Sequence, residues 1–183
     1  MKDLIPKTLN SRIPSSLVLE IAPTNPGVYS IFLIEGIQLP HNIQAGKNGC
    51  IYIGKGEKGL KRRFSQEHLR TGNSGRSAFR RRLGAVLKEE LDLKAIPRDN
   101  KYGRKYYKFT DEGEKALTDW ISNNTLFGWC ELGKGADFRM AEKVLADDLH
   151  PPLPDQPDWG NPFKEQISRL YKICQDEATK AIP

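Results

Sequence analysis

The chain has 183 residues, of which 38% are hydrophobic and 28% charged, and it carries a net charge of +6 at neutral pH. This length can bury a core without disulfides or metals, so we expect one domain over residues 26–183 behind an irregular lead-in over residues 1–25. No apolar run approaches the about 18 residues that a membrane span needs, and the N-terminal stretch lacks the apolar centre of a signal peptide. We therefore expect a cytoplasmic protein that has no membrane partner.

Two runs rich in β-branched and aromatic residues predict strands in the first third of the chain. The first is GVYSIFLIEG, which begins at Gly27, and the second is CIYIG, which begins at Cys50. A polar connection over residues 38–49 separates them. We expect the two strands to pair as an antiparallel hairpin with a long loop.

Apolar periodicity and turn residues predict the elements that follow. In chain order they are a helix over residues 60–69, a helix over 77–91, a strand over 106–109, a helix from residue 111, a strand over 125–132, and helices over 138–149 and 162–180. Asp111, with Glu114 three residues later, is a variant of the capping box that begins a helix. This order suits an α+β fold, in which helices flank a small, mostly antiparallel sheet.

The cysteines and histidines match no common metal or redox motif. Cys50, Cys130 and Cys174 form no C-x-x-C pair, and the three histidines form no H-x-x-x-H pair. We therefore expect neither a zinc site nor a disulfide framework, and we interpret the cysteines as small core residues.

Positive charge is concentrated in one segment. Residues 55–82 contain ten basic and two acidic side chains, which leaves the rest of the chain with a net charge of −2. A positive field confined to one segment suits a polyanion such as nucleic acid, and a solvated basic helix is the alternative.

Three glycines have the G-x-G-x-x-G spacing of a dinucleotide-binding turn: Gly54, Gly56 and Gly59. That fold needs an acidic residue about 20 positions further on, and no Asp or Glu lies between His68 and Lys88. The residues after Gly59 also fail the P-loop pattern. We therefore expect Gly54 and Gly56 to let a phosphate approach the backbone closely, with a cofactor-binding enzyme as an alternative.

Two tyrosine triplets resemble the signature of the GIY-YIG nuclease family. Gly27-Val-Tyr29 stands for the first triplet and Tyr52-Ile-Gly54 for the second. The helix that follows begins with Leu60-Lys-Arg-Arg63, where the family carries an arginine at the place of Arg63. A histidine or tyrosine usually comes one turn later, where this chain has Glu67, and His68 is the next residue.

The resemblance continues to about residue 165. Arg80 matches an arginine that one subgroup of the family carries on a second helix. Glu142, ahead of the proline-rich turn that begins at Pro151, matches the family's metal-binding glutamate. The asparagine that often follows is replaced here by Pro154, and Asn161 is the nearest substitute.

By resemblance, the chain is expected to be a metal-dependent endonuclease that hydrolyses DNA, of restriction type among other options. Glu142 would bind Mg²⁺ or another divalent ion such as Mn²⁺, because these ions prefer hard carboxylate oxygens. Arg63 would bind phosphate through its planar fork, with Arg62 as the alternative. Tyr29 would activate or position the attacking water, with Tyr52 as its partner and His68 assisting either. The expected catalytic residues are Tyr29, Tyr52, Arg63, His68 and Glu142.

The tyrosines can take a proton from water only if nearby cations lower their pKa from about 10. The metal ion, Arg63 and Lys55 could provide that field.

Basic side chains are expected to contact the nucleic acid, which is DNA, with RNA as an alternative. They are Lys55, Lys61, Arg62, Arg76, Arg80 and Arg81. Specificity would come from the loops over residues 38–49 and 94–104, or from a homodimer. A nucleic-acid-binding module with the same fold but no cleavage activity is the main alternative function.

Overall fold

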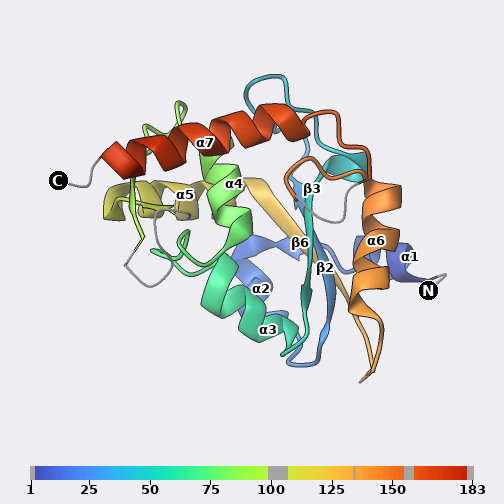
Figure 1. Cartoon of the computed structure of the whole chain (residues 1–183). Helices are drawn as coiled ribbons and strands as arrows, with labels where there is room; N and C mark the ends of the chain where they lie inside the picture. The colour runs from blue at the N-terminus through green and yellow to red at the C-terminus, as the bar shows by residue number, and fades with distance from the viewer. Residues whose placement is uncertain (1–2, 99–106, 134, 155–158, 181–183) are drawn as a thin grey trace.

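The computed structural model describes residues 3–98, 107–133, 135–154 and 159–180, and the fold is α+β as predicted (Figure 1). Its centre is a four-stranded antiparallel sheet with the strand order β1-β6-β2-β3. The strands are β1 (Ile13–Pro14), β2 (Gly27–Leu33), β3 (Cys50–Gly56) and β6 (Thr125–Glu131). The predicted hairpin of β2 and β3 is confirmed, and β6 pairs with the other side of β2.

Helices surround this sheet, and a second, two-stranded sheet lies beside it. The helices are α1 (Leu4–Asn10), α2 (Val18–Ile21), α3 (Leu60–Arg63), α4 (Ala78–Val86), α5 (Asp111–Asn124), α6 (Phe138–Leu149) and α7 (Lys164–Lys180). A π-helical turn over Phe64–His68 continues α3. The small sheet pairs β4 (Ala95–Pro97) with β5 (Tyr107–Phe109), and the predicted loop over 94–104 lies partly outside the described residues.

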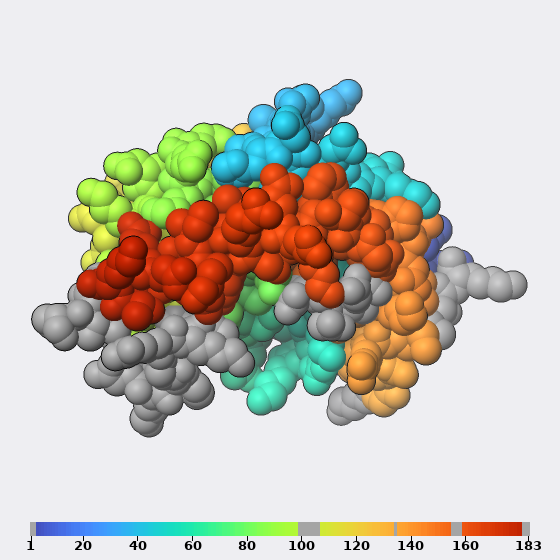
Figure 2. Space-filling view, turned by 45° about the horizontal axis from the view of Figure 1, so that its top comes forward, coloured from blue at the N-terminus to red at the C-terminus, as the bar shows by residue number. Residues whose placement is uncertain are grey.

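Alternating side chains of the hairpin face two separate hydrophobic clusters, because successive strand residues point to opposite faces. Val28 and Phe32 pack with residues of α1 and α6 on one face. Tyr29, Ile31 and Tyr52 pack with residues of α3 and α4 on the other. Helix α7 packs on α4 and forms a ridge across the molecule (Figure 2). Tyr29 and Tyr52, two of the residues predicted to be catalytic, therefore lie on the face of the sheet that α3 and α4 cover.

The N-terminal segment, predicted to be irregular, is ordered and belongs to the sheet. It contains α1 and α2, and Ile13 of β1 pairs with Phe127 of β6. Pro14 is tolerated because β1 is an edge strand. Polar side chains secure the segment: the Ser11 Oγ donates to the Trp129 carbonyl at 2.8 Å. The prediction was wrong because a two-residue strand beside prolines carries almost no periodicity.

The three cysteines are buried free thiols, as predicted. Among the described residues, no helix is long and apolar enough to cross a membrane.

Helix α5 begins differently from the prediction. Thr110, rather than Asp111, caps the helix by accepting from the Gly113 N–H. Glu114 instead turns into the interior, where its Oε2 lies 2.8 Å from Nη2 of Arg80. Arg80 is completely buried, so the prediction that it contacts nucleic acid is wrong.

We predict that Arg80→Met destabilises the fold by about 3–5 kcal/mol, because it leaves the Glu114 carboxylate buried without its cation. The double variant Arg80→Met/Glu114→Leu should be less destabilised than the single variant. Urea unfolding measures both. The control is Asp147→Asn, which breaks an exposed pair with Lys143 and should cost about 0–1 kcal/mol. A cost for Arg80→Met no larger than that of the control would contradict the prediction.

Candidate active site

Tyr29 lies across the neighbouring strand, in space that a glycine leaves open. It pairs with Gly54 in the β2–β3 ladder, and a Cβ at Gly54 would lie only 2.6 Å from Cζ of Tyr29. The expectation that Gly54 makes room for a phosphate is therefore wrong, because the Tyr29 ring occupies that room. Gly27 has a similar role, since its Cβ would lie 2.8 Å from Cδ1 of Leu60. The glycines of both triplets set how closely tyrosine and helix pack on the sheet.

Gly59 serves the turn that leads into α3. Its φ of +108° is a conformation that favours glycine, and a Cβ there would overlap the Thr24 carbonyl oxygen. Gly56 lines an open groove beside this turn.

Tyr29, Tyr52 and His68 form one aromatic cluster. The ring centroids are 6.4 Å apart for the two tyrosines, 5.4 Å for Tyr29 and His68, and 6.0 Å for Tyr52 and His68. The ring centroid of Phe64 lies 5.0 Å from that of Tyr29, and the ring centroid of Phe79 lies 5.2 Å from that of Tyr52. The structure thus brings together three of the five residues predicted to be catalytic.

A π-helical turn explains why His68 comes one residue late in the sequence. The Leu69 N–H donates to the Phe64 carbonyl, five residues back, so this turn holds one residue more than an α-helical turn. Glu67 consequently forms an ion pair with Arg63, and His68 turns inward to Tyr29. The extra residue places His68 in the site.

His68 is a neutral, buried imidazole with two side-chain partners. Its Nε2 forms a hydrogen bond with Oη of Tyr29, and its Nδ1 lies 2.8 Å from Oγ of Ser77. Burial, together with the charges of Arg63 and Arg80, holds the pKa of His68 well below its ordinary value of 6.5. It is therefore uncharged at neutral pH.

Arg63 connects the buried cluster to the surface. Its Nε donates to Oη of Tyr29 at 3.3 Å, while its Nη1 is paired with Glu67. It also borders an open groove of about 400 Å³. The groove is further lined by Lys55, Gly56, Glu57, Lys58, Gly59, Arg62, Gln66 and Glu67.

Glu142 approaches from α6, on the other side of the sheet edge. Its Oε2 lies 3.5 Å from Nζ of Lys55, which also pairs with Glu57 at 3.0 Å. Burial raises the pKa of Glu142, while the nearby Lys55 ammonium lowers it. Among the described residues, no group of three or more His, Cys, Asp or Glu side chains could hold a metal ion. A cation at Glu142 would therefore need oxygens from water or a ligand as well.

The charges around Tyr52 are mostly positive. Burial raises the pKa of this phenol, and Arg63, Arg81 and Arg82 lower it while Glu142 raises it. Arg82 was not among the predicted residues. Its guanidinium lies 5.7 Å from the ring centre of Tyr171 on α7, a pairing between distant segments that no sequence pattern indicates. A site with this surplus of guanidinium groups suits an anionic ligand.

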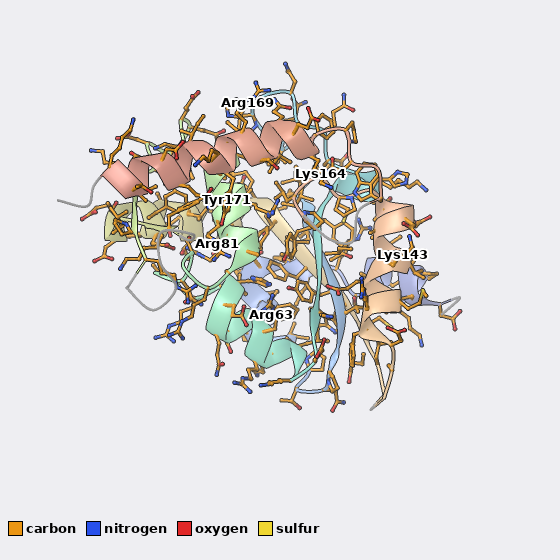
Figure 3. The ribbon with its side chains drawn as sticks, in the orientation of Figure 1. Arg63, Arg81, Lys143, Lys164, Arg169 and Tyr171 are labelled. Carbon is orange, nitrogen blue, oxygen red and sulfur yellow. The ribbon has the colours of Figure 1, made fainter. Side chains whose placement is uncertain are left out.

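Arg81 and Tyr171 lie on the α4 and α7 side of the site, above Arg63 (Figure 3). The Arg81 Nε donates to Oη of Tyr171 at 3.2 Å, and its Nη1 donates to the Ser74 carbonyl at 2.8 Å. These contacts connect α4 to α7, and Arg81 is only 7% exposed. Its contact with nucleic acid stays a prediction.

The remaining basic residues lie at the surface. Lys55 and Arg62 line the groove, Lys61 is half-buried on α3, and Arg76 is exposed. Asn161 lies apart from them: its Nδ2 donates to the Pro152 carbonyl at 2.6 Å and its Oδ1 accepts from the Phe163 N–H. It holds the proline-rich turn in place.

Comparison with protein families gives a match. A family model described as the GIY-YIG catalytic domain matches residues 27–173, which is most of the chain. Comparison with curated proteins gives no significant match, and comparison with solved structures gives none either.

We predict that neutral His68 makes stability pH-dependent. Because its pKa is lower in the folded protein, the unfolded chain binds an extra proton below pH 6.5 or so. This stability is present above the unfolded pKa and is lost as the pH falls toward the folded value, by up to about 1.4 kcal/mol per pH unit. Urea unfolding between about pH 5 and 7.5 measures the slope.

The matched variant is His68→Gln, which keeps every carboxylate and removes the imidazole. Its stability should fall less steeply with acid than that of the wild type. Equal slopes in the two proteins would show that His68 binds the same number of protons in both states.

Proposed function

Because the chain belongs to the GIY-YIG family of nuclease catalytic domains, we propose that it is a metal-dependent endonuclease that hydrolyses DNA phosphodiester bonds. The observation that carries this proposal is the convergence of Tyr29, His68 and Arg63 beside a groove lined with basic residues. Glu142 contributes a partly buried carboxylate to the edge of the same site.

Arg63 is suited to bind the phosphate that is cleaved. It borders the groove, and its planar guanidinium can donate two parallel hydrogen bonds to phosphate oxygens. Glu67 holds this guanidinium in the free protein. A phosphate that takes both Nη1 and Nη2 would replace Glu67, and Arg63 would then stabilise the negative charge that grows on the phosphate during attack by water.

Tyr29 is suited to act on the attacking water. Burial and the neighbouring Tyr52 raise its pKa, so the phenol is protonated in the free protein. To accept a proton from the attacking water, Tyr29 must first release its own proton to solvent, and the negative charge of the phenolate must then be balanced. Arg63 and His68 both contact the Tyr29 oxygen, and the Arg63 guanidinium lowers the pKa of this phenol.

Glu142 is suited to hold a divalent metal ion, Mg²⁺ or Mn²⁺. The fit rests on the carboxylate oxygens of Glu142, which are the hard ligands that these ions prefer. Burial raises the pKa of this carboxylate because it disfavours the negative charge, and a bound cation would offset that cost. Lys55 need not block the ion, because it also pairs with Glu57. When bound, such an ion supplies positive charge at the phosphate and lowers the pKa of its water ligands.

DNA is the proposed substrate, and the cytoplasm is the proposed location, as expected from the sequence. A restriction-type role, with specificity supplied by a homodimer, remains a prediction. The charged and polar side chains that line the groove suit the phosphates that DNA and RNA share.

We predict that plasmid DNA is cleaved in Mg²⁺ and that Arg63→Ala and Glu142→Ala each lower the rate by about 10²–10³-fold, the usual cost of losing one electrostatic stabiliser. The controls are Arg169→Ala, an exposed change on α7 (Figure 3), and Asp147→Asn on α6. A structured RNA is tested in parallel. Gel analysis of the products measures all rates.

Unchanged cleavage in both site variants would sink the nuclease assignment to this site. Salt-sensitive binding with no cleavage in any divalent metal would favour the nucleic-acid-binding module instead. A thermal shift with dinucleotides would favour the cofactor-binding alternative.

We also predict that Glu67→Gln strengthens DNA binding. The change releases Arg63 from its ion pair, and a pair of this exposure is worth up to about 1 kcal/mol, or about fivefold in Kd. Fluorescence anisotropy with a labelled duplex in EDTA measures Kd at several salt concentrations. The control is Asp176→Asn, which removes an exposed i,i+4 partner of Lys172 on α7. Weaker binding would mean that Glu67 positions Arg63 rather than competing with phosphate.

A further inference from the structure

We propose that Ser77 is a positioning residue that holds His68 in the tautomer with its proton on Nε2, so that the Tyr29 oxygen accepts hydrogen bonds from both His68 and Arg63. This assignment stands on the hydrogen-bond geometry. Only its kinetic consequence rests on the proposed nuclease function.

A continuous chain of hydrogen bonds runs from the groove into the interior. It begins with Arg63 Nε and Tyr29 Oη at 3.3 Å, and continues from Tyr29 to Nε2 of His68. Nδ1 of His68 then lies 2.8 Å from Oγ of Ser77, which accepts from the Arg80 N–H at 3.2 Å. Both ends of the chain are therefore closed by groups that can only donate.

Ser77 occupies its place for a reason independent of His68. It is the N-cap of α4, and its Oγ satisfies one of the free N–H groups of that helix. The helix thus holds the hydroxyl rigidly at the edge of the imidazole. A cap and a histidine partner are combined in one side chain.

Counting protons selects the tautomer. Tyr29, neutral His68 and Ser77 each contribute one proton, but the two links between them need only two. One proton must therefore point out of the chain, at the Ser77 end or at the Tyr29 end. A buried hydroxyl that finds no acceptor costs free energy.

The Ser77 end offers no place for this proton. Ser77 is completely buried, and within the described part of the chain its Oγ has hydrogen-bond contacts only with His68 and the Arg80 N–H. Tyr29 is completely buried as well, but its oxygen contacts Arg63, which is partly exposed and borders the open groove, whereas both partners of Ser77 are buried. We place the free proton at the Tyr29 end, where a water or phosphate oxygen beside Arg63 can accept it. Ser77 therefore donates to Nδ1, and the His68 proton lies on Nε2.

This arrangement prepares the Tyr29 oxygen for negative charge. In the resting state the oxygen accepts from Arg63 and from His68, and its own proton points toward the groove. If that proton leaves, every link of the chain keeps its donor and acceptor. In the opposite tautomer Tyr29 would have to donate to His68, and Ser77 would lose its acceptor.

Nuclear magnetic resonance of ¹⁵N-histidine-labelled protein tests the tautomer directly, because the two ring nitrogens differ in chemical shift when one carries the proton. The His68 signals are assigned by their loss in His68→Gln. We expect the Nε2–H form in the wild type and in Ser77→Thr, which keeps the hydroxyl. Ser77→Ala should give a mixture of tautomers. Nδ1–H in the wild type, or an unchanged tautomer in Ser77→Ala, would overturn the proposal.

Thr110→Ala is the matched control, because it removes the cap of α5 without touching His68. We expect Ser77→Ala to lower kcat about tenfold more than Thr110→Ala, with KM unchanged. The ascending limb of the pH profile, which reports the loss of the Tyr29 proton, should move to higher pH. Equal losses in the two variants would reduce Ser77 to a helix cap. The resonance experiment needs no cleavage, so it decides the tautomer even if the proposed function fails.

Discussion

The buried guanidinium of Arg80 is the point on which the site and its scaffold both depend. It pairs with Glu114 of α5, and it also donates to the carbonyl of His68 at 3.2 Å. Its backbone N–H meets the cap oxygen of Ser77. One residue thus joins α4, α5 and the π-helical turn, and a charge that is costly to bury is stabilised by several partners at once. The position of His68 follows from this junction.

The groove contains cations that can attract an anion and carboxylates that pair with those cations. Arg63 and Lys55, two cations that line the groove, are each paired with a carboxylate, Glu67 and Glu57 respectively. Such pairs keep the long side chains in place in the free protein. A ligand that carries several negative charges can replace both carboxylates at once. A polyanion meets that condition more easily than a small monoanion does.

Sequence reasoning found the α+β class, the hairpin, helix α6 to the residue, and the cluster of Tyr29, Tyr52 and Arg63. These features leave local signals in the form of alternation, periodicity and ordered motifs. It failed where a contact joins distant segments. Arg80 looks like surface charge until Glu114 arrives from 34 residues away. Strand β1 likewise exists only because β6 pairs with it.

The π-helical turn shows that two residues of a motif can keep their relative position in space when the number of residues between them changes by one. A helix can absorb one added residue within a single turn and leave the flanking backbone on its course. By resemblance to the family, a histidine or tyrosine is expected at the position of Glu67, and His68 is the next residue. In the fold, the imidazole of His68 contacts Tyr29, and the side chain of Glu67 pairs with Arg63. The π-helical turn thereby lets two consecutive residues place a carboxylate beside Arg63 and an imidazole beside Tyr29.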